Sequence, residues 1–342
     1  MGWYSGAMPR SARLDSPGVL HHIMIRGIER KAIFKSDGDR EDFLERLSTL
    51  VPETKTGCYA WALMGNHGHF LLRSGPGGIA QLMRRLLTGY GVSYNRRHRR
   101  HGQLFQNRYK SIICQEDAYL QELVRYIHLN PLRARVVTDI GELNRYAYSG
   151  QSALMGHCKR PWQDTEYVLS VFGRSIKGGR RAYASYVAAG IAQGKRPELT
   201  GGGLIRSMGG WGEIRKGRKS SGERIKSDER ILGDSDFVMS VLSEANERLD
   251  HRYELKSKGV DLDRVAGRAE EVLGVEPGTV HSKGRRRNQT LVRDLFCYWA
   301  VRELGMSNTE VGKKLGISQP AVGYAVRRGD ALAKERGFHL LD

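Results

Sequence analysis

Two apolar runs joined by the dipeptide Gly65-Asn66 constrain the fold of this 342-residue chain more than any other feature. Gly-Asn between the two halves of the segment Tyr59–Leu72 is typical of a turn between paired strands. A further strand is expected over residues 19–25. Helical spacing of apolar residues predicts helices over residues 37–50, 79–94 and 117–137. Strand, helix, strand, strand, helix indicates an α+β fold, with helices packed on a mostly antiparallel sheet.

The patterning changes twice along the chain. From about residue 150, glycine pairs and basic runs replace the apolar periodicity, and beyond Gly233 the pattern is purely helical. We therefore expect an α+β domain over residues 1–152, a glycine-rich, basic connecting region over 153–232 and a helical domain over 233–342.

The charge balance restricts the partners. The chain has 56 Lys and Arg against 37 Asp and Glu, a net charge of +19, which favours nucleic acid or an anionic membrane surface. No apolar run approaches the ~18–20 residues of a spanning helix, and the N-terminus lacks a signal-peptide core. The four cysteines form no C-x-x-C pair, which argues against a disulfide scaffold or a zinc finger. A cytoplasmic protein that binds nucleic acid rather than membrane is expected.

Residues 67–69 are His-Gly-His in the second strand of the expected hairpin. Residues two apart share one face of a strand, so His67 and His69 can present two imidazoles side by side. Two imidazoles and one oxygen ligand suit a divalent catalytic metal. The alternatives are a merely polar surface pair, or a zinc site that recruits Cys58 or Cys114, which the spacing does not support.

Tyr126 and Asn130 lie four residues apart in an expected helix, hence on one face with Cβ atoms roughly 6 Å apart. This places a phenol beside an amide oxygen that can complete a metal shell. A Tyr hydroxyl, with a free pKa of about 10, becomes a competent nucleophile when a metal polarises the phosphate that it attacks. Alternatively, Tyr126 is a core aromatic and Asn130 ends the helix before Pro131.

Taken together, these strings resemble a known family. The His-x-His strand, the string Leu-Phe-Gln-Asn-Arg-Tyr-Lys-Ser over residues 104–111, and Tyr-Ile-His-x-Asn-Pro on a helix are similar to REP-associated tyrosine transposases. These have an IS200-like domain and belong to the HUH single-tyrosine transposases. The resemblance runs from about Leu14 to Ser152, and it implies a ferredoxin-like domain with the histidine pair on its central sheet.

The resemblance also implies a reaction. Tyr126 would attack a phosphodiester in single-stranded DNA, forming a 5′-phosphotyrosine and releasing a 3′-hydroxyl. His67 and His69, with Asn130 as third ligand, would hold Mg²⁺ or Mn²⁺ on the scissile phosphate. Resealing would reverse the attack and needs no ATP.

Gly68 and His128 are neighbours of these residues in the sequence. The family normally has a bulky hydrophobic residue between the two histidines, and Gly68 stands there in this chain. We expect Gly68 to weaken the strand and to leave an apolar pocket unfilled. His128 follows Tyr126 by two residues, points away from its face of the helix and is expected to be structural.

Basic residues are clustered around these strings, and single-strand binders combine such charge with aromatic side chains on which bases stack. Tyr90, Tyr94, Phe105 and Tyr109 are the expected aromatic platforms. The expected DNA-binding basic residues of this region are Arg26, Arg84, Arg85, Arg96, Arg97, Arg108, Lys110 and Arg133. Alternatively, each charge is only a solvated surface residue.

The C-terminal region has the outline of a helix-turn-helix. Ser307 and Glu310 form a capping box, Gly316 makes a turn, and Ser318 caps a second helix that reaches about Arg328. With an upstream basic loop and long helix, the region from about 261 to 336 resembles the DNA-binding domain of the replication initiator DnaA. Expected contacts to duplex DNA are Arg285, Arg286, Arg287, Ser318, Gln319, Tyr324, Arg327 and Arg328. A plain helical bundle is the alternative.

The leading hypothesis is a metal-dependent tyrosine transposase that cleaves and rejoins single-stranded DNA at hairpins or repeats, with duplex DNA bound by the C-terminal domain. One tyrosine per chain suggests that two active sites cooperate in a full strand transfer, which a homodimer would supply. The alternatives are a DNA-binding regulator with little or no catalysis, favoured by Gly68, and an RNA-binding protein, which the charge permits and no RNA motif supports.

Overall fold

The structure is a computed structural model that describes residues 14–194, 196, 199–200, 228–282, 284 and 286–341. The chain separates into two compact units, residues 1–242 and 243–342. Within the described residues, no helix combines the length and the apolar composition that crossing a bilayer requires. The domain limits at residues 152 and 232 stay predictions.

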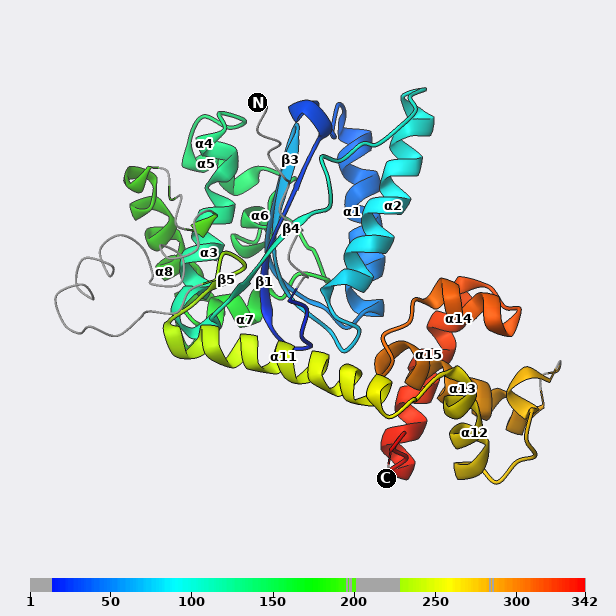
Figure 1. Ribbon diagram of the computed structural model, residues 1–342. Helices are drawn as coiled ribbons and strands as arrows, with labels where there is room; N and C mark the ends of the chain where they lie inside the picture. The colour runs from blue at the N-terminus through cyan, green and yellow to red at the C-terminus, as the bar shows by residue number, and fades with distance from the viewer. Residues whose placement is uncertain are drawn as a thin grey trace, which may run out of the picture. The chain divides into compact units, whose positions relative to one another are not determined.

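The first unit is built on one sheet with the strand order β2-β3-β1-β4-β5. Its strands are β1 (Leu20–Arg26), β2 (Gly57–Met64), β3 (His67–Arg73), β4 (Lys110–Cys114) and β5 (Ile231–Leu232). All neighbours are antiparallel except the pair β4 and β5. Helix α1 (Asp37–Glu53) joins β1 to β2, and α2 (Ile79–Arg97) joins β3 to β4. This split βαβ arrangement confirms the ferredoxin-like α+β prediction (Figure 1).

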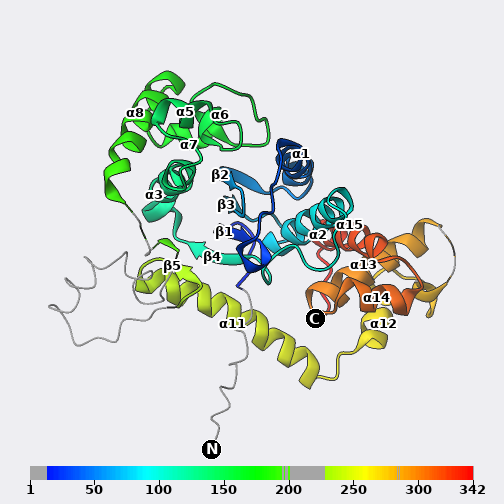
Figure 2. The same cartoon turned by 90° about the horizontal axis from the view of Figure 1, so that it is seen from above.

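Helices cover both faces of this sheet (Figure 2). On one face, α1 and α2 bury Phe43, Leu86, Ile23 and Phe70. The other face is covered by α3 (Glu116–His128), α4 (Asn130–Arg133), α5 (Ile140–Arg145), α6 (Gln151–Leu154), α7 (Thr165–Ser170) and α8 (Ile176–Ala189). Successive strand residues point to opposite faces, so β1 sends Leu20 toward the α3 core and Ile23 toward the α1 and α2 core.

Some of these elements lay outside the sequence predictions. Strand β4 is only five residues long and begins with Lys110 and Ser111, so it carries little periodicity. Helices α7 and α8 follow residue 153, and they contribute Val168, Tyr183 and Val187 to the core under α3. This part of the chain therefore adds to the first unit's core.

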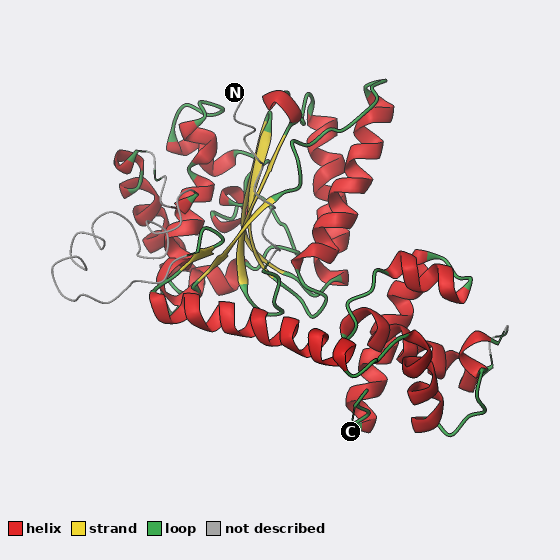
Figure 3. Ribbon diagram, viewed as in Figure 1, coloured by secondary structure: helices red, strands yellow, loops and turns green. Residues whose placement is uncertain are grey.

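The second unit is helical (Figure 3). Its helices are α12 (Leu262–Val272), α13 (Arg287–Arg302), α14 (Asn308–Leu315) and α15 (Gln319–Arg336), preceded by α11 (Ser235–Ser257). Ser307 and Glu310 form the expected capping box, and Gly316 ends α14 with φ 66°. Val322 and Val326 face the core as expected. The predicted pair of helices and its glycine turn is confirmed, although α15 continues eight residues beyond Arg328.

Candidate active site

The two histidines of the His-x-His string project from β3 toward α3. Their ring centroids are 5.5 Å apart with an interplanar angle of 78°, and the His69 ring lies 5.9 Å from the ring of Tyr126. His69 is only 7% exposed, whereas His67 is half-buried at the start of the strand. The alternation of β3 thus brings the pair and Tyr126 to one face of the sheet.

Tyr126 lies half-buried in the last turn of α3. Leu129 keeps helical backbone angles between α3 and α4, so Asn130 follows Tyr126 at nearly one helical turn. Asn130 is 9% exposed, and its Nδ2 has no hydrogen-bond partner among the described residues. This nitrogen only donates hydrogen bonds, so a metal ligand from this side chain would be its amide oxygen.

A third histidine, His22 of β1, completes the cluster. Its Nε2 lies 3.0 Å from Nδ1 of His69, its Nδ1 lies 3.2 Å from the carbonyl oxygen of Leu199, and its ring is 5.8 Å from that of Tyr126. His22 was not among the residues predicted from the sequence. The signal was present, because one of two consecutive strand histidines, His21 and His22, must face the same side as His69.

Burial keeps these imidazoles neutral. Burial lowers the pKa of His22 to about 4, and burial together with the charge of Arg26 lowers that of His67 to about 4. Burial, reinforced by His22 and His67, holds the pKa of His69 well below its usual range. Neutral imidazoles carry the lone pair that a metal ligand needs.

Arg133 of α4 lies over Tyr126, with its guanidinium carbon 5.4 Å from the ring centroid. Its Nη2 approaches the carbonyl oxygen of Gly190 at 3.5 Å, while Nε and Nη1 are buried without a hydrogen-bond partner among the described residues. Burial lowers the pKa of this guanidinium, and Tyr126 opposes that shift. A desolvated cation with two unused N–H donors is a strong site for an anionic oxygen.

Comparison with known families assigns this part of the chain. Residues 17–130 match the family of IS200-like transposases. The matched segment is about one third of the chain. The match includes His67, His69, Tyr126 and Asn130, and the resemblance noted in the sequence is confirmed for this domain, whereas the DnaA-like resemblance stays a prediction.

The chain is similar to a REP-associated tyrosine transposase bound to a REP hairpin, with 13% sequence identity and a TM-score of 0.37, covering 43% of this chain and 84% of that one. No curated protein matches the chain.

Three of the predicted DNA-binding residues of the first unit lie on or just before the strands next to the histidines. Arg26 ends β1 and stands opposite His67 in the register. Lys110 opens β4 opposite Met24, and its Nζ donates to the carbonyl oxygen of Thr200 at 2.6 Å. Arg108 is exposed just before β4. The end of the sheet at which β1 finishes and β4 begins is therefore basic close to the histidine pair.

The four predicted DNA-binding arginines of α2 lie on the opposite face of the sheet from Tyr126. Arg85 pairs with Glu53 at 2.6 Å. Arg97 pairs with Asp39 at 2.7 Å and Asp42 at 3.1 Å. Arg84 and Arg96 are exposed. The structure does not bring these side chains together with Tyr126, and their contact with DNA stays a prediction.

The expected aromatic platforms are wrong for three of the four residues. Tyr90, Tyr94 and Tyr109 are 0%, 1% and 8% exposed and belong to the core under α1 and α2. Tyr94 donates its hydroxyl to the carbonyl oxygen of Ala32 at 2.9 Å, and Tyr90 donates to that of Ile33. Tyr90 and Tyr94 are four residues apart on the inner face of α2, so they pack together instead of stacking on bases.

Gly68 leaves no unfilled pocket, so that expectation is also wrong. A Cβ at this position would lie 3.2 Å from the ring of Phe70 and 3.3 Å from Cγ1 of Ile25. These two side chains already occupy the space beside Gly68. His128, by contrast, is structural as expected, because it is fully buried and its Nδ1 lies 2.6 Å from the Tyr183 hydroxyl.

In the second unit, the predicted DNA-binding residues have different surroundings. Ser318 is the N-cap of α15 and accepts from the Ala321 amide, and Gln319 is exposed. Tyr324 is 58% exposed, and the Arg327 guanidinium lies 4.8 Å from its ring centroid. Arg328 instead pairs with the buried Asp294, with nitrogen–oxygen distances of 2.6 and 2.7 Å.

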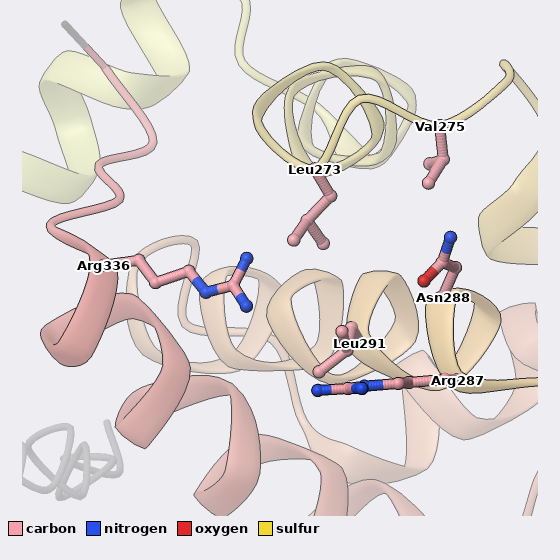
Figure 4. A pocket seen from close by; sticks show the side chains of 6 residues that line it. All are labelled: Leu273, Val275, Arg287, Asn288, Leu291 and Arg336. Atoms are coloured by element: carbon pink, nitrogen blue, oxygen red, sulfur yellow. The ribbon is translucent and has the colours of Figure 1, made fainter.

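The basic loop before α13 has two described arginines. Arg286 and Arg287 are exposed at the start of α13, and Arg285 lies outside the described residues. Arg287 lines a pocket of about 200 Å³ together with Leu273, Leu291 and Arg336, and Figure 4 shows Leu273 and Arg336 pointing into it. The predicted DNA contacts of this loop stay predictions.

Proposed function

We propose that this protein cleaves and rejoins single-stranded DNA through a 5′-phosphotyrosine formed on Tyr126, as a transposase acting at hairpins or repeats. The observation that carries the proposal is the meeting of Tyr126 with two neutral histidines and the unpaired guanidinium of Arg133 on one face of the sheet. Each group matches one need of phosphoryl transfer: a nucleophile, metal ligands and a cation for phosphate oxygens.

The residues present fit a divalent cation such as Mg²⁺ or Mn²⁺. Among the described residues, no group of three His, Cys, Asp and Glu side chains has the placement for a metal ion, so a third ligand must be of another type. The amide oxygen of Asn130 would supply that ligand, since Asn130 is largely buried and follows Tyr126 by nearly one helical turn. A metal bound to His67, His69 and Asn130 would act as a Lewis acid on the scissile phosphate.

The zinc alternative has no structural support. Cys58 is 1% exposed and lies in the core under α1 and α2, on the other face of the sheet. Burial raises the pKa of its thiol far above the usual range, which disfavours the thiolate that zinc binds. Cys114 is also buried, in the core under α3, where its thiol contacts the carbonyl oxygen of Ile112.

The reaction then follows from the placement of the side chains. The Oη of Tyr126 forms a bond to phosphorus as the bond to the 3′-oxygen breaks, and the phenolic proton ends on the released 3′-hydroxyl. Arg133 donates Nε–H and Nη1–H to non-bridging oxygens, whose charge grows in the transition state. Rejoining is the reverse attack by a 3′-hydroxyl.

A labelled-DNA assay tests the proposal. The full-length protein is incubated with Mn²⁺ and single-stranded hairpin oligonucleotides from repeats flanking the gene, labelled at either end, and run on a denaturing gel. We expect a covalent protein–DNA band that carries the 3′ label and a free fragment that carries the 5′ label. Tyr126→Phe should abolish both, whereas Tyr119→Phe on the same helix should keep them. Metal-dependent cutting without the covalent band would contradict the role of Tyr126.

For the second unit, we propose binding to duplex DNA through α15 and the loop before α13. The exposed pair Tyr324 and Arg327 supports this, because a stacked arginine and an exposed ring at the start of a second helix suit contact with a groove. We also propose that this unit resembles the DNA-binding domain of DnaA and that the protein acts as a homodimer. The regulator alternative loses its main support, since Gly68 sits in a filled core.

A further inference from the structure

His22 lies behind His69 in a short chain of hydrogen bonds that begins at a backbone carbonyl. The Leu199 oxygen lies 3.2 Å from Nδ1 of His22, and Nε2 of His22 lies 3.0 Å from Nδ1 of His69. His22, His69 and Leu199 are 0%, 7% and 2% exposed. Water therefore does not supply alternative partners for the ring nitrogens of His22.

The donor and acceptor roles in this series of hydrogen bonds follow from the carbonyl oxygen of Leu199 at its start. A carbonyl oxygen only accepts, so Nδ1 of His22 must carry a hydrogen. A neutral imidazole has one N–H, which makes Nε2 of His22 the acceptor. Nδ1 of His69 must then be the donor, and the lone pair of His69 is left on Nε2, the ring nitrogen that does not contact His22.

A similar arrangement fixes which ring nitrogen of His67 carries the hydrogen. Nδ2 of Asn66 donates to the carbonyl oxygen of Arg30 at 3.0 Å, so the amide oxygen of Asn66 is the atom that faces His67. That oxygen lies 2.6 Å from Nδ1 of His67 and can only accept. His67 therefore also carries its hydrogen on Nδ1 and its lone pair on Nε2.

We infer that His22 is a positioning residue, which holds His69 as the Nδ1–H tautomer so that its Nε2 is presented to the metal. The inference rests on the proposed function for the metal, but the tautomer itself is a property of the metal-free protein. Partners behind histidine ligands fix the ring orientation and the tautomer, and their loss commonly weakens metal binding by about 10- to 100-fold.

The tautomer is tested directly by NMR. Full-length protein with ¹⁵N-labelled histidine, free of metal and DNA, should show His69 with a protonated Nδ1 and an unprotonated Nε2. In His22→Phe, which removes the acceptor, the two tautomers should mix. His69 protonated on Nε2 in the wild-type protein would overturn the inference.

Mn²⁺ affinity gives a second readout without DNA. We expect His22→Phe to weaken Mn²⁺ binding about 10- to 100-fold. His22→Gln keeps an acceptor for His69 and should recover part of the loss. His21→Gln is the matched control, because His21 is equally buried on β1, bonds to Ser111 and should leave the affinity unchanged. A folded His22→Phe with wild-type affinity would refute the positioning role.

The outcomes separate this inference from the proposed reaction. If Tyr126→Phe still forms the covalent band while the tautomer and Mn²⁺ results hold, the reaction proposal fails and the role of His22 stands. If the band depends on Tyr126 but neither the tautomer nor the Mn²⁺ affinity responds to replacement of His22, the reaction proposal stands and the role of His22 fails. Should His22→Phe not fold, the wild-type tautomer and the His22→Gln affinity still decide the question.

Discussion

The guanidinium carbon of Arg133 lies 5.4 Å from the centroid of the Tyr126 ring, and two of its nitrogens are buried without partners among the described residues. We expect Arg133→Ala to slow formation of the covalent protein–DNA band by about 100- to 1,000-fold, the usual effect of losing one donor to a charged transition state. Arg133→Lys should recover only part of the rate, since lysine keeps the charge and loses the planar fork. The measurement is a single-turnover time course with 3′-labelled hairpin DNA.

Arg135 provides the control for that experiment. It is exposed, two residues further along, and its replacement by alanine should leave the rate unchanged. Equal rates for Arg133→Ala and wild type would remove Arg133 from the reaction.

Acid should destabilise the fold through His21. This side chain is fully buried, its Nε2 has no partner among the described residues, and burial lowers its pKa to about 4 from 6.5. Below pH 6.5 the unfolded chain binds a proton that the folded chain does not, so the free energy of unfolding falls by about 1.4 kcal/mol per pH unit until near pH 4. Above pH 6.5 the effect is absent.

Urea unfolding at pH 7.0, 6.0 and 5.0 measures this slope. His21→Gln removes the titrating group, so its curve should be flatter than that of wild type by about 1.4 kcal/mol per pH unit. Parallel curves for the two proteins would show that His21 titrates normally in the folded state.

A bulky residue at position 68 should be destabilising in this chain. Gly68→Leu places its side chain against Phe70 and Ile25 and should lower the free energy of unfolding by about 1–3 kcal/mol. Phe70→Ala opens that space, so the double variant should be less destabilised than the two single changes together. Additive effects of the two changes in a double-mutant cycle would argue against shared space.

Two adjacent arginines of α15 should behave differently. Arg327→Ala should weaken duplex binding and reduce the salt dependence of the affinity by about one phosphate contact, because Arg327 is exposed beside Tyr324. Arg328→Ala leaves Asp294, which is 3% exposed, without its partner. We expect a loss of about 1–3 kcal/mol of stability there. Fluorescence anisotropy with duplex DNA measures the loss of binding, and urea unfolding measures the loss of stability. Unchanged duplex binding by Arg327→Ala would contradict the proposed surface.

Local patterns predicted much of the fold. The Gly65-Asn66 turn, the helices α1, α2 and α3, and the shared face of His67 and His69 all follow from periodicity and turn chemistry. The partners of the site were harder to predict because they are distant in the chain. His22 contacts Leu199, which lies 177 residues away, and no spacing rule connects them. Burial of Tyr90 and Tyr94 depended on which face of α2 meets the sheet.

The contacts made beyond residue 152 set a practical lower limit on the length of an active fragment. The carbonyl of Leu199 directs His22, that of Gly190 approaches Arg133, and the hydroxyl of Tyr183 holds His128. A chain cut after Asn130, where the family match ends, would keep Tyr126 and the candidate ligands but would lose Arg133, the Leu199 carbonyl and the Tyr183 hydroxyl. Recombinant versions of this protein should therefore extend at least through Thr200.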